Sequence, residues 1–135
     1  MSAKPLYGSD TAISVTLDNL ANGAIADSTE FNNTALLGLG FRIGVDAKGS
    51  NAAETGSLIV YARGGLVTGK MATDKNLTRI GSIVLNGDTA VYGEFLYESP
   101  APFFKLSFKQ ASSGGYALFG SGNSATRLTE NIQDV

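Results

Sequence analysis

The stretch Ala35–Ala47, ALLGLGFRIGVDA, decides the fold that this sequence predicts. Large apolar residues recur there at every second position, and glycine or charged residues fill most of the positions between them. A period of two matches a β-strand, whose side chains alternate between two faces, and does not match the 3.6-residue turn of a helix. We therefore predict a long strand with one buried face. Its apolar positions are Leu37, Leu39, Phe41, Ile43 and Val45.

The opposite face of this strand carries small residues. Glycine weakens a strand through lost entropy and packing, unless another backbone has to approach that face closely. The face is therefore expected to lie against something, either the chain's own loops or another copy of the chain. The residues that we consider for an oligomer interface are Gly38, Gly40, Arg42 and Gly44.

The composition limits the kinds of protein that this chain can be. Its 135 residues predict a single domain over 1–135, with residues 1–10 as an extended arm. The chain has no cysteine, histidine or tryptophan, which excludes disulfides, thiol chemistry and the commonest general base. A net charge of -2 without a basic run argues against a nucleic-acid partner. No signal peptide or membrane-length apolar run is found, so we expect a soluble protein made in the cytoplasm, without a membrane partner.

Other segments also carry strand signals, separated by turn residues at intervals of about 8 to 12 residues. Two of these segments, Leu20–Ala26 and Leu66–Met71, are the weakest. About eight strands without a long helix predict an antiparallel β-sandwich, and eight strands in two sheets would form a jelly roll. The remaining segments are Thr11–Leu17, Ser57–Gly64, Arg79–Leu85, Thr89–Tyr97, Phe103–Lys109, Tyr116–Phe119 and Ala125–Ile132.

Two local patterns predict how segments are joined. Asn86-Gly87-Asp88 lies between two strand-like runs, which is a strong hairpin signal because asparagine and glycine tolerate positive φ. Asp27 with Glu30 resembles a capping box, but the residues that follow do not favour a helix. We expect a hairpin at the first pattern and at most one helical turn at the second.

The side chains available for chemistry are mainly carboxylates, lysines and hydroxyls. A glycosidase needs two carboxylates across a cleft, but charged side chains at these positions are better explained as solvated loop and strand-face groups. Asp74, Asn76 and Asp88 fit no calcium-loop spacing. We therefore predict no enzyme activity, no catalytic residues, no metal and no cofactor. The carboxylates considered for a pair are Asp46, Glu54, Asp74, Asp88, Glu94 and Glu98.

Four phenylalanines fit either of two roles, a binding platform or part of the core. Exposed aromatic rings can stack on sugars or bases, whereas alternating ones are buried. The alternation of Phe103–Lys109 favours the core for Phe104 and Phe108. The other two are Phe95 and Phe103.

Residues 14–34, SVTLDNLANGAIADSTEFNNT, with the long strand and residues 56–65, GSLIVYARGG, resemble a group of small virion structural proteins of tailed bacteriophages. Similar proteins begin with a strand, a Leu-Ala-x-Gly turn and a Ser and Asn-Thr segment before the long strand. They later carry a strand that ends in Tyr-Ala-x-Gly. The resemblance covers roughly residues 14–65, about half of the chain.

The resemblance implies a non-enzymatic jelly-roll decoration, or cement, protein on the outer surface of a phage head. Its partners would be the major capsid protein and further copies of itself, as a homotrimer or homodimer. The arm and a basic excursion are our candidates for capsid contact, although Lys70 and Lys75 equally fit solubilising charges. The candidates are Lys4, Pro5, Leu6, Tyr7, Arg63, Lys70, Lys75 and Arg79.

Two alternatives belong to other classes of function. A receptor- or carbohydrate-binding domain of a phage tail or fibre would need an exposed aromatic cluster, and the absence of tryptophan counts against it. A carboxylate-dependent hydrolase would need a carboxylate pair such as Asp46 and Glu94.

Overall fold

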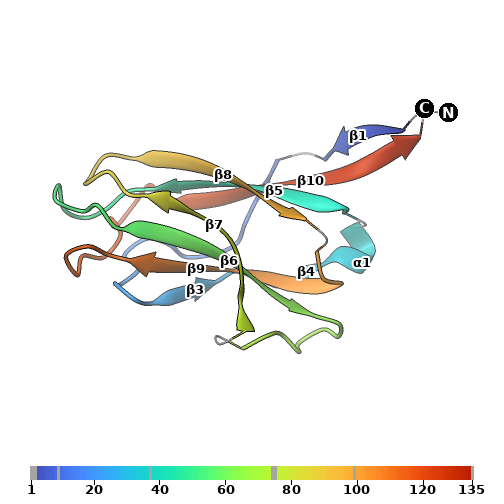
Figure 1. The fold of residues 1–135 in the computed structure, drawn as a ribbon, viewed down its shortest axis with the longest axis horizontal. Coiled ribbons are helices and arrows are strands. Elements are labelled where there is room, and N and C mark those ends of the chain that lie inside the picture. The colour runs from blue at the N-terminus through green and yellow to red at the C-terminus, as the bar shows by residue number, and fades with distance from the viewer. Residues whose placement is uncertain (1–2, 9, 37, 74–75, 99, 135) are drawn as a thin grey trace.

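The computed structural model describes residues 3–8, 10–36, 38–73, 76–98 and 100–134, which form two antiparallel sheets packed face to face (Figure 1). The first, which we call the β5 sheet, has the order β1-β10-β5-β8, and β2 also pairs with β10. The second, the β6 sheet, has the order β3-β9-β6-β7, and β4 also pairs with β9. In the β5 sheet the strands are β1 (Ala3–Tyr7), β2 (Thr11–Ala12), β5 (Gly40–Ala47), β8 (Val91–Glu98) and β10 (Ser124–Asp134). In the β6 sheet they are β3 (Ile25–Asp27), β4 (Phe31–Asn32), β6 (Ser57–Gly65), β7 (Thr78–Val84) and β9 (Phe103–Ala111).

The strand order is that of a jelly roll. We count β1 and β2 as one strand, and β3 and β4 as another, which gives eight strands numbered in chain order. The β5 sheet then has the order first, eighth, third, sixth. The β6 sheet then reads second, seventh, fourth, fifth. This arrangement of two interleaved antiparallel sheets confirms the predicted sandwich and its jelly-roll topology.

The core lies between the sheets and is made by alternate residues of three central strands. Each of these side chains is almost fully buried, so the period of two seen in the sequence marks the inner faces of β5 and β9 correctly, and for β6 the structure decides between the two faces. Lys105 and Lys109, at the intervening positions of β9, lie on the outer face. The inner-face residues are Phe41, Ile43 and Val45 of β5, Leu58, Val60 and Ala62 of β6, and Phe104, Leu106 and Phe108 of β9.

An aromatic cluster joins the two sheets near one end of the sandwich. The ring of Phe104 on β9 lies 5.0 Å from that of Phe41 on β5 and 5.1 Å from that of Tyr97 on β8. Phe31 on β4 stacks on the same ring at 5.0 Å. Such contacts add to the free energy gained by burying apolar area. Phe104 and Phe108 are therefore core residues, as predicted, and Phe95 packs against the core from the side.

The long strand begins later than its sequence pattern predicts. β5 starts at Gly40, because Asn33–Leu36 form a single helical turn, α1, and the chain then turns into the strand. The Asn33 side chain closes this turn: it accepts a hydrogen bond from the Gly38 amide at 2.8 Å and donates one to the Gly38 carbonyl at 3.0 Å. Leu39 is consequently exposed rather than on the core face, and Leu37 lies outside the described residues. The helical turn was expected near Asp27–Glu30, so that position was also wrong.

The segment Thr11–Leu17 was predicted as a strand, and only Thr11–Ala12 is one. The segment crosses from one sheet to the other: Ile13 donates its amide to Ala125 of β10, and the Ser14 carbonyl accepts from Thr29, next to β4. A chain that bonds to both sheets in turn cannot pair along one strand. Ile13 and Leu17 still enter the core.

The other two segments that are not strands are Leu66–Met71 and Tyr116–Phe119. In the first, Val67 and Lys70 form an isolated bridge around a turn, and Leu66 is 81% exposed. In the second, successive amides bond to different loops, with Leu118 donating to Leu20 and Phe119 to Lys48. Leu118 is nevertheless buried, which explains its strand-like pattern.

The turn at Asn86–Thr89 is present, but the strands that it joins do not pair with each other. Gly87 has a φ of 59° and the Thr89 amide donates to Asn86 at 3.0 Å. β7 belongs to the β6 sheet and β8 to the β5 sheet, so the turn crosses the sandwich. Between β7 and β8, side chains of one strand pack directly against glycines of the other: a Cβ at Gly93 of β8 would lie 2.0 Å from the Ile83 side chain of β7. The predicted paired hairpin is therefore wrong, although the turn itself is correct.

We predict that Phe104→Ala destabilises the fold by about 3 to 5 kcal/mol, because it leaves a cavity among rings from both sheets. The free energy of unfolding, measured by denaturant titration, checks this value. Leu66→Ala is the matched control and should change stability by no more than about 0.5 kcal/mol. Equal losses in the two variants would contradict the assignment of the core.

Candidate functional site

A two-stranded ribbon projects from one end of the sandwich and carries both termini (Figure 1). β10 pairs with β5 only as far as Glu130, which lies opposite Gly40. Beyond that point, Asn131–Asp134 pair with Ala3–Leu6 of β1 alone. We call these two segments the terminal ribbon. A two-stranded ribbon is marginally stable in water on its own, so this element gains most from a partner that covers it.

The N-terminal arm predicted from the sequence is thus held by the chain's own last strand. Its four candidate contact residues, Lys4, Pro5, Leu6 and Tyr7, all lie in β1. Tyr7 faces Glu130 in register and its side chain is 47% exposed. The guanidinium of Arg42 lies 5.9 Å from the Tyr7 ring, so the base of the ribbon connects to the outer face of β5.

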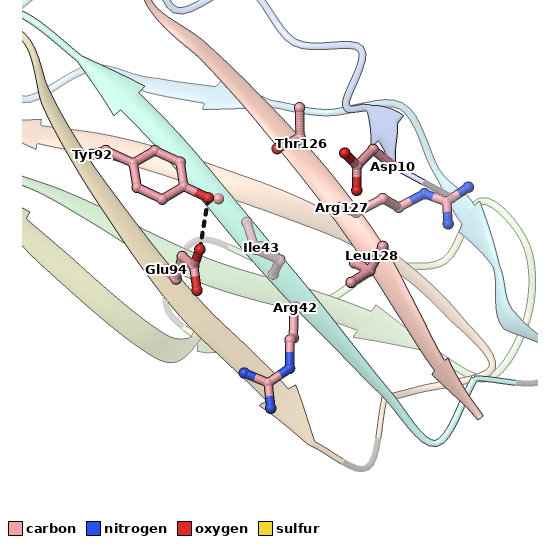
Figure 2. A pocket seen from close by; sticks show the side chains of 9 residues that line it. Asp10, Arg42, Ile43, Tyr92, Glu94, Thr126, Arg127 and Leu128 are labelled. Carbon is pink, nitrogen blue, oxygen red and sulfur yellow. Dashed lines mark hydrogen bonds between the residues drawn. The ribbon is translucent and has the colours of Figure 1, made fainter. Parts of the chain in front are cut away.

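The outer face of the β5 sheet contains a shallow hollow of about 190 Å³ (Figure 2). It lies over Gly44, between β8 on one side and β10 on the other. Tyr92 and Glu94 project from β8, and Thr126 and Leu128 from β10. Asp10, Arg42, Ile43 and Arg127 complete the lining.

Tyr92 is the large exposed ring of this hollow. Its side chain passes over β5, so a Cβ added at Gly44 would lie 2.3 Å from the Tyr92 hydroxyl. The hydroxyl donates a hydrogen bond of 3.0 Å to Glu94, and this bond, with partial burial, raises the pKa of Tyr92. Arg42 sits on the other side, paired with Glu130 at 2.6 Å, and that hydrogen bond raises the pKa of Arg42.

The predicted oligomer-interface residues divide into two groups. Gly40, Arg42 and Gly44 lie on the outer face of β5, as expected. Gly38 precedes the strand and faces the other way: a Cβ there would lie 2.8 Å from the Phe41 ring. Tyr92 already covers part of Gly44, so the chain itself accounts for one of the small residues.

The predicted basic excursion is only partly available to a partner. Arg63 is 8% exposed: it donates to the Ser107 hydroxyl at 3.2 Å and to the Ala72 carbonyl at 2.9 Å, and lies 3.5 Å from Asp27. It therefore holds the 66–72 loop to the outer face of the β6 sheet. Lys70 and Arg79 are exposed, and Lys75 lies outside the described residues.

The candidate carboxylates have different surroundings. Asp46, Asp88, Glu94 and Glu98 are exposed, on the outer face of the β5 sheet or at the turn before β8, and Asp74 lies outside the described residues. Glu54 is fully buried. Among the described residues, no group of three or more acidic side chains could hold a metal ion, and no helix is long and apolar enough to cross a membrane.

Glu54 ties together two loops at the end of the sandwich away from the ribbon. It accepts hydrogen bonds from the amides of Gly56 and Ser113, at 2.7 and 2.9 Å, and from the hydroxyls of Ser112 and Ser113. Burial alone would raise its pKa, but these hydrogen bonds more than offset that effect and hold the pKa at about 2. A carboxylate this fully bonded is a structural group, so Glu54 is not a catalytic candidate.

The sequence did not identify Tyr92 as a site residue. The alternation of Val91–Glu98 predicts the face of the strand on which Tyr92 lies. It does not predict that the Tyr92 ring extends over Gly44, where the absence of a side chain leaves room for it. The register between β5 and β8, which sets Asp46 opposite Tyr92, was needed to bring them together. The signal present in the sequence was the pair of glycines on one face of β5.

Comparisons with known proteins place few limits on function. No protein-family model and no curated protein matches the chain. Among solved structures, the xylan-binding domain CBM22-1 of Paenibacillus barcinonensis Xyn10C aligns over 97% of this chain and 84% of that domain. The sequence identity is 11% and the TM-score is 0.44.

We predict that Glu54→Gln lowers the free energy of unfolding by about 2 kcal/mol, since it weakens several hydrogen bonds to a buried charge. The wild-type contribution is fully present above the unfolded pKa, near 4.5, and is lost as pH falls toward the folded pKa of about 2. Urea titrations at neutral pH and at about pH 3 measure both effects. The difference between wild type and variant should shrink at low pH, and a constant difference would contradict this account.

Proposed function

We propose that this chain is a non-enzymatic structural protein of a virion, a decoration or cement protein on the outside of a tailed-phage head. It would act by burying surface across the joints between capsid subunits, so that opening the shell also requires breaking these contacts. The sequence resemblance over residues 14–65 supports this role, and the jelly-roll sandwich is compatible with it.

The single observation that carries the proposal is the terminal ribbon. Ala3–Leu6 and Asn131–Asp134 continue past the last β5 pairing and have no third strand beside them in the described chain. Up to Glu130, one edge of β10 pairs with β5. Along Asn131–Asp134 the same edge has no strand beside it in the described chain, so its backbone N–H and C=O groups can pair with a strand of another protein. A projecting ribbon of this kind suits insertion into a neighbouring protein surface.

Weak individual contacts are sufficient for such a protein. A homotrimer or homodimer would engage several capsid subunits at once, and linked contacts raise the overall affinity by orders of magnitude. Each contact of ordinary size buries about 1,200 to 2,000 Å². The proposed partners are accordingly the major capsid protein and other copies of this chain.

Removal of residues 1–8 should weaken binding to expanded phage heads that lack this protein by at least about tenfold, because it removes one strand of the ribbon. Co-sedimentation with heads measures the bound fraction. The described core begins at Ile13, so the shortened chain is expected to remain folded, which circular dichroism checks.

Asp88→Asn, at the exposed turn between β7 and β8, is the control for this binding experiment and should bind as the wild type does. The wild type should also raise the melting temperature of the heads. A wild-type protein that does not pellet with heads would contradict the proposal. Equal binding by the shortened chain would show that the terminal ribbon is not the element that contacts the head.

Carbohydrate binding is a second candidate function, and the hollow over Gly44 favours it. An exposed tyrosine ring beside carboxylate and guanidinium groups offers both a stacking surface and partners for sugar hydroxyls. In this reading, the chain would be a receptor- or carbohydrate-binding domain of a phage tail or fibre.

A glycan array that includes plant and bacterial polysaccharides tests this second function. Wild-type binding should fall by at least about tenfold in Tyr92→Ala, because stacking on one ring contributes about 1 to 3 kcal/mol in comparable ring contacts. Val84→Ala removes a similarly exposed side chain from the other sheet and should have no effect. An array without hits would exclude the function.

A further inference from the structure

The outer face of the β5 sheet is acidic. Strand register places the outward side chains of β8, β5 and β10 in adjacent rows, with Asp46 opposite Tyr92 and Arg42 opposite Leu96. Arg127 borders the hollow, but it alternates with the outward Thr126 and Leu128, and its guanidinium lies 5.3 Å from the Phe31 ring, so we do not count it among the charges of this surface. Among the side chains that the structure describes, the charged groups of this surface, which we call the acidic face, are five carboxylates and one guanidinium. They are Asp10, Asp46, Glu94, Glu98, Glu130 and Arg42.

The outer face of the β6 sheet is basic with an apolar centre. Ile59 and Tyr61 of β6 lie in the middle, with Lys109 opposite Ile59 on β9 and Arg79 opposite Tyr61 on β7. Lys105 lies four residues before Lys109 on β9, on the same side of the sheet. We call these five residues the basic face.

Three cations of the basic face are available to another molecule. No carboxylate of the described residues lies within 4 Å of a charged nitrogen of Arg79, Lys105 or Lys109. The acid nearest the centre of this sheet, Asp27, faces Arg63. Glu30, near Lys105 at the edge, is held by the hydroxyl of Thr68 and the amide of Gly69.

We propose that the basic face docks on the acidic face of a second copy of this chain. The charge complementarity favours this occupant: each copy carries both faces, on opposite sides of one sandwich, and the two have opposite sign. Contacts of this kind are heterologous, because different surfaces meet, so they repeat from copy to copy rather than closing in a pair. The inference does not depend on the virion role proposed above.

The size of the faces indicates a weak and reversible contact. Four strands about 4.8 Å apart, with about eight residues at 3.3 Å each, cover roughly 500 Å². Docking would therefore bury on the order of 1,000 Å² in total, below the size of a standard stable interface. Affinity should fall steeply with salt, because the Debye length shortens from roughly 30 Å at about 0.01 M to roughly 3 Å at about 1 M.

Sedimentation velocity on the purified full chain tests the proposal. At about 0.01 M salt the weight-average mass should rise about twofold between about 10 μM and about 1 mM protein, and at about 1 M salt the rise should disappear. A mass that stays that of a monomer at low salt, at every concentration, would overturn the proposal.

Charge reversal of each face separates this contact from any other self-association. Lys105→Glu/Lys109→Glu makes both faces acidic, and Glu94→Lys/Glu98→Lys cancels the negative charge of the acidic face, so neither variant alone should associate with itself. An equimolar mixture of the two should associate again, because the unchanged basic face of the second variant then meets the unchanged acidic face of the first. Asp88→Lys, which changes charge away from both faces, should associate as the wild type does.

Three further results would overturn the proposal that the two faces dock on each other. Association that survives in either double variant, or a mixture that stays monomeric while the wild type associates, would show that another surface is used. Retention of the wild-type chain on heparin without self-association, lost in Lys105→Glu/Lys109→Glu, would assign the basic face to a different anionic partner and overturn the proposal. Melting temperatures near that of the wild type exclude unfolding as the cause.

Discussion

The contact between the rings of Phe41 and Phe104 holds the two sheets together, and the rest of the structure depends on it. One ring comes from the β5 sheet and the other from the β6 sheet, and Tyr97 and Phe31 pack around them. These rings lie at the end of the sandwich from which β10 continues into the terminal ribbon. The ribbon therefore starts from a rigid base, even though its own two strands have no sheet beneath them.

The opposite end of the sandwich is fixed by a different interaction. Glu54, buried and surrounded by donors from Gly56, Ser112 and Ser113, joins the loop before β6 to the loop after β9. The rings at one end and the bonded carboxylate at the other lie away from the outer sheet faces, where Arg63 holds the 66–72 loop and Arg42 pairs with Glu130. The hollow and the two oppositely charged surfaces occur on those outer faces, so alternation along each strand places them on the side away from the core.

The sequence predicted the parts of this fold that depend on alternation and local turns. Alternation in β5 and β9 identified the inner faces, and the turn at Asn86–Thr89 was found from its residues. The errors have one cause: whether a segment pairs depends on which backbone lies beside it, which local pattern does not contain. Ile13 and Leu118 alternate like strand residues because they reach the core. The Ile13 amide, however, bonds to Ala125 of β10 just before the chain crosses to the other sheet, and the Leu118 amide bonds to the loop residue Leu20.

The candidate site was harder to predict for the same reason. The glycines of β5 indicated a face with close neighbours, but the ring over Gly44 comes from a strand 48 residues away in sequence, and only register connects them. Arg63 was selected for its charge, whereas its burial depends on the 66–72 loop folding over it. The ribbon arises because β1 and β10 continue together beyond Gly40, the first residue of β5. The sequence pattern of neither strand alone shows this pairing.

Hydrogen–deuterium exchange of the protein, free and bound to phage heads, tests the central claim that the terminal ribbon is the docking element. The account predicts that the amides of Ala3–Leu6 and Asn131–Asp134 exchange quickly in the free protein, as marginal ribbons do, and become protected on heads. Protection confined to residues around the hollow, with the ribbon still exchanging quickly, would contradict it.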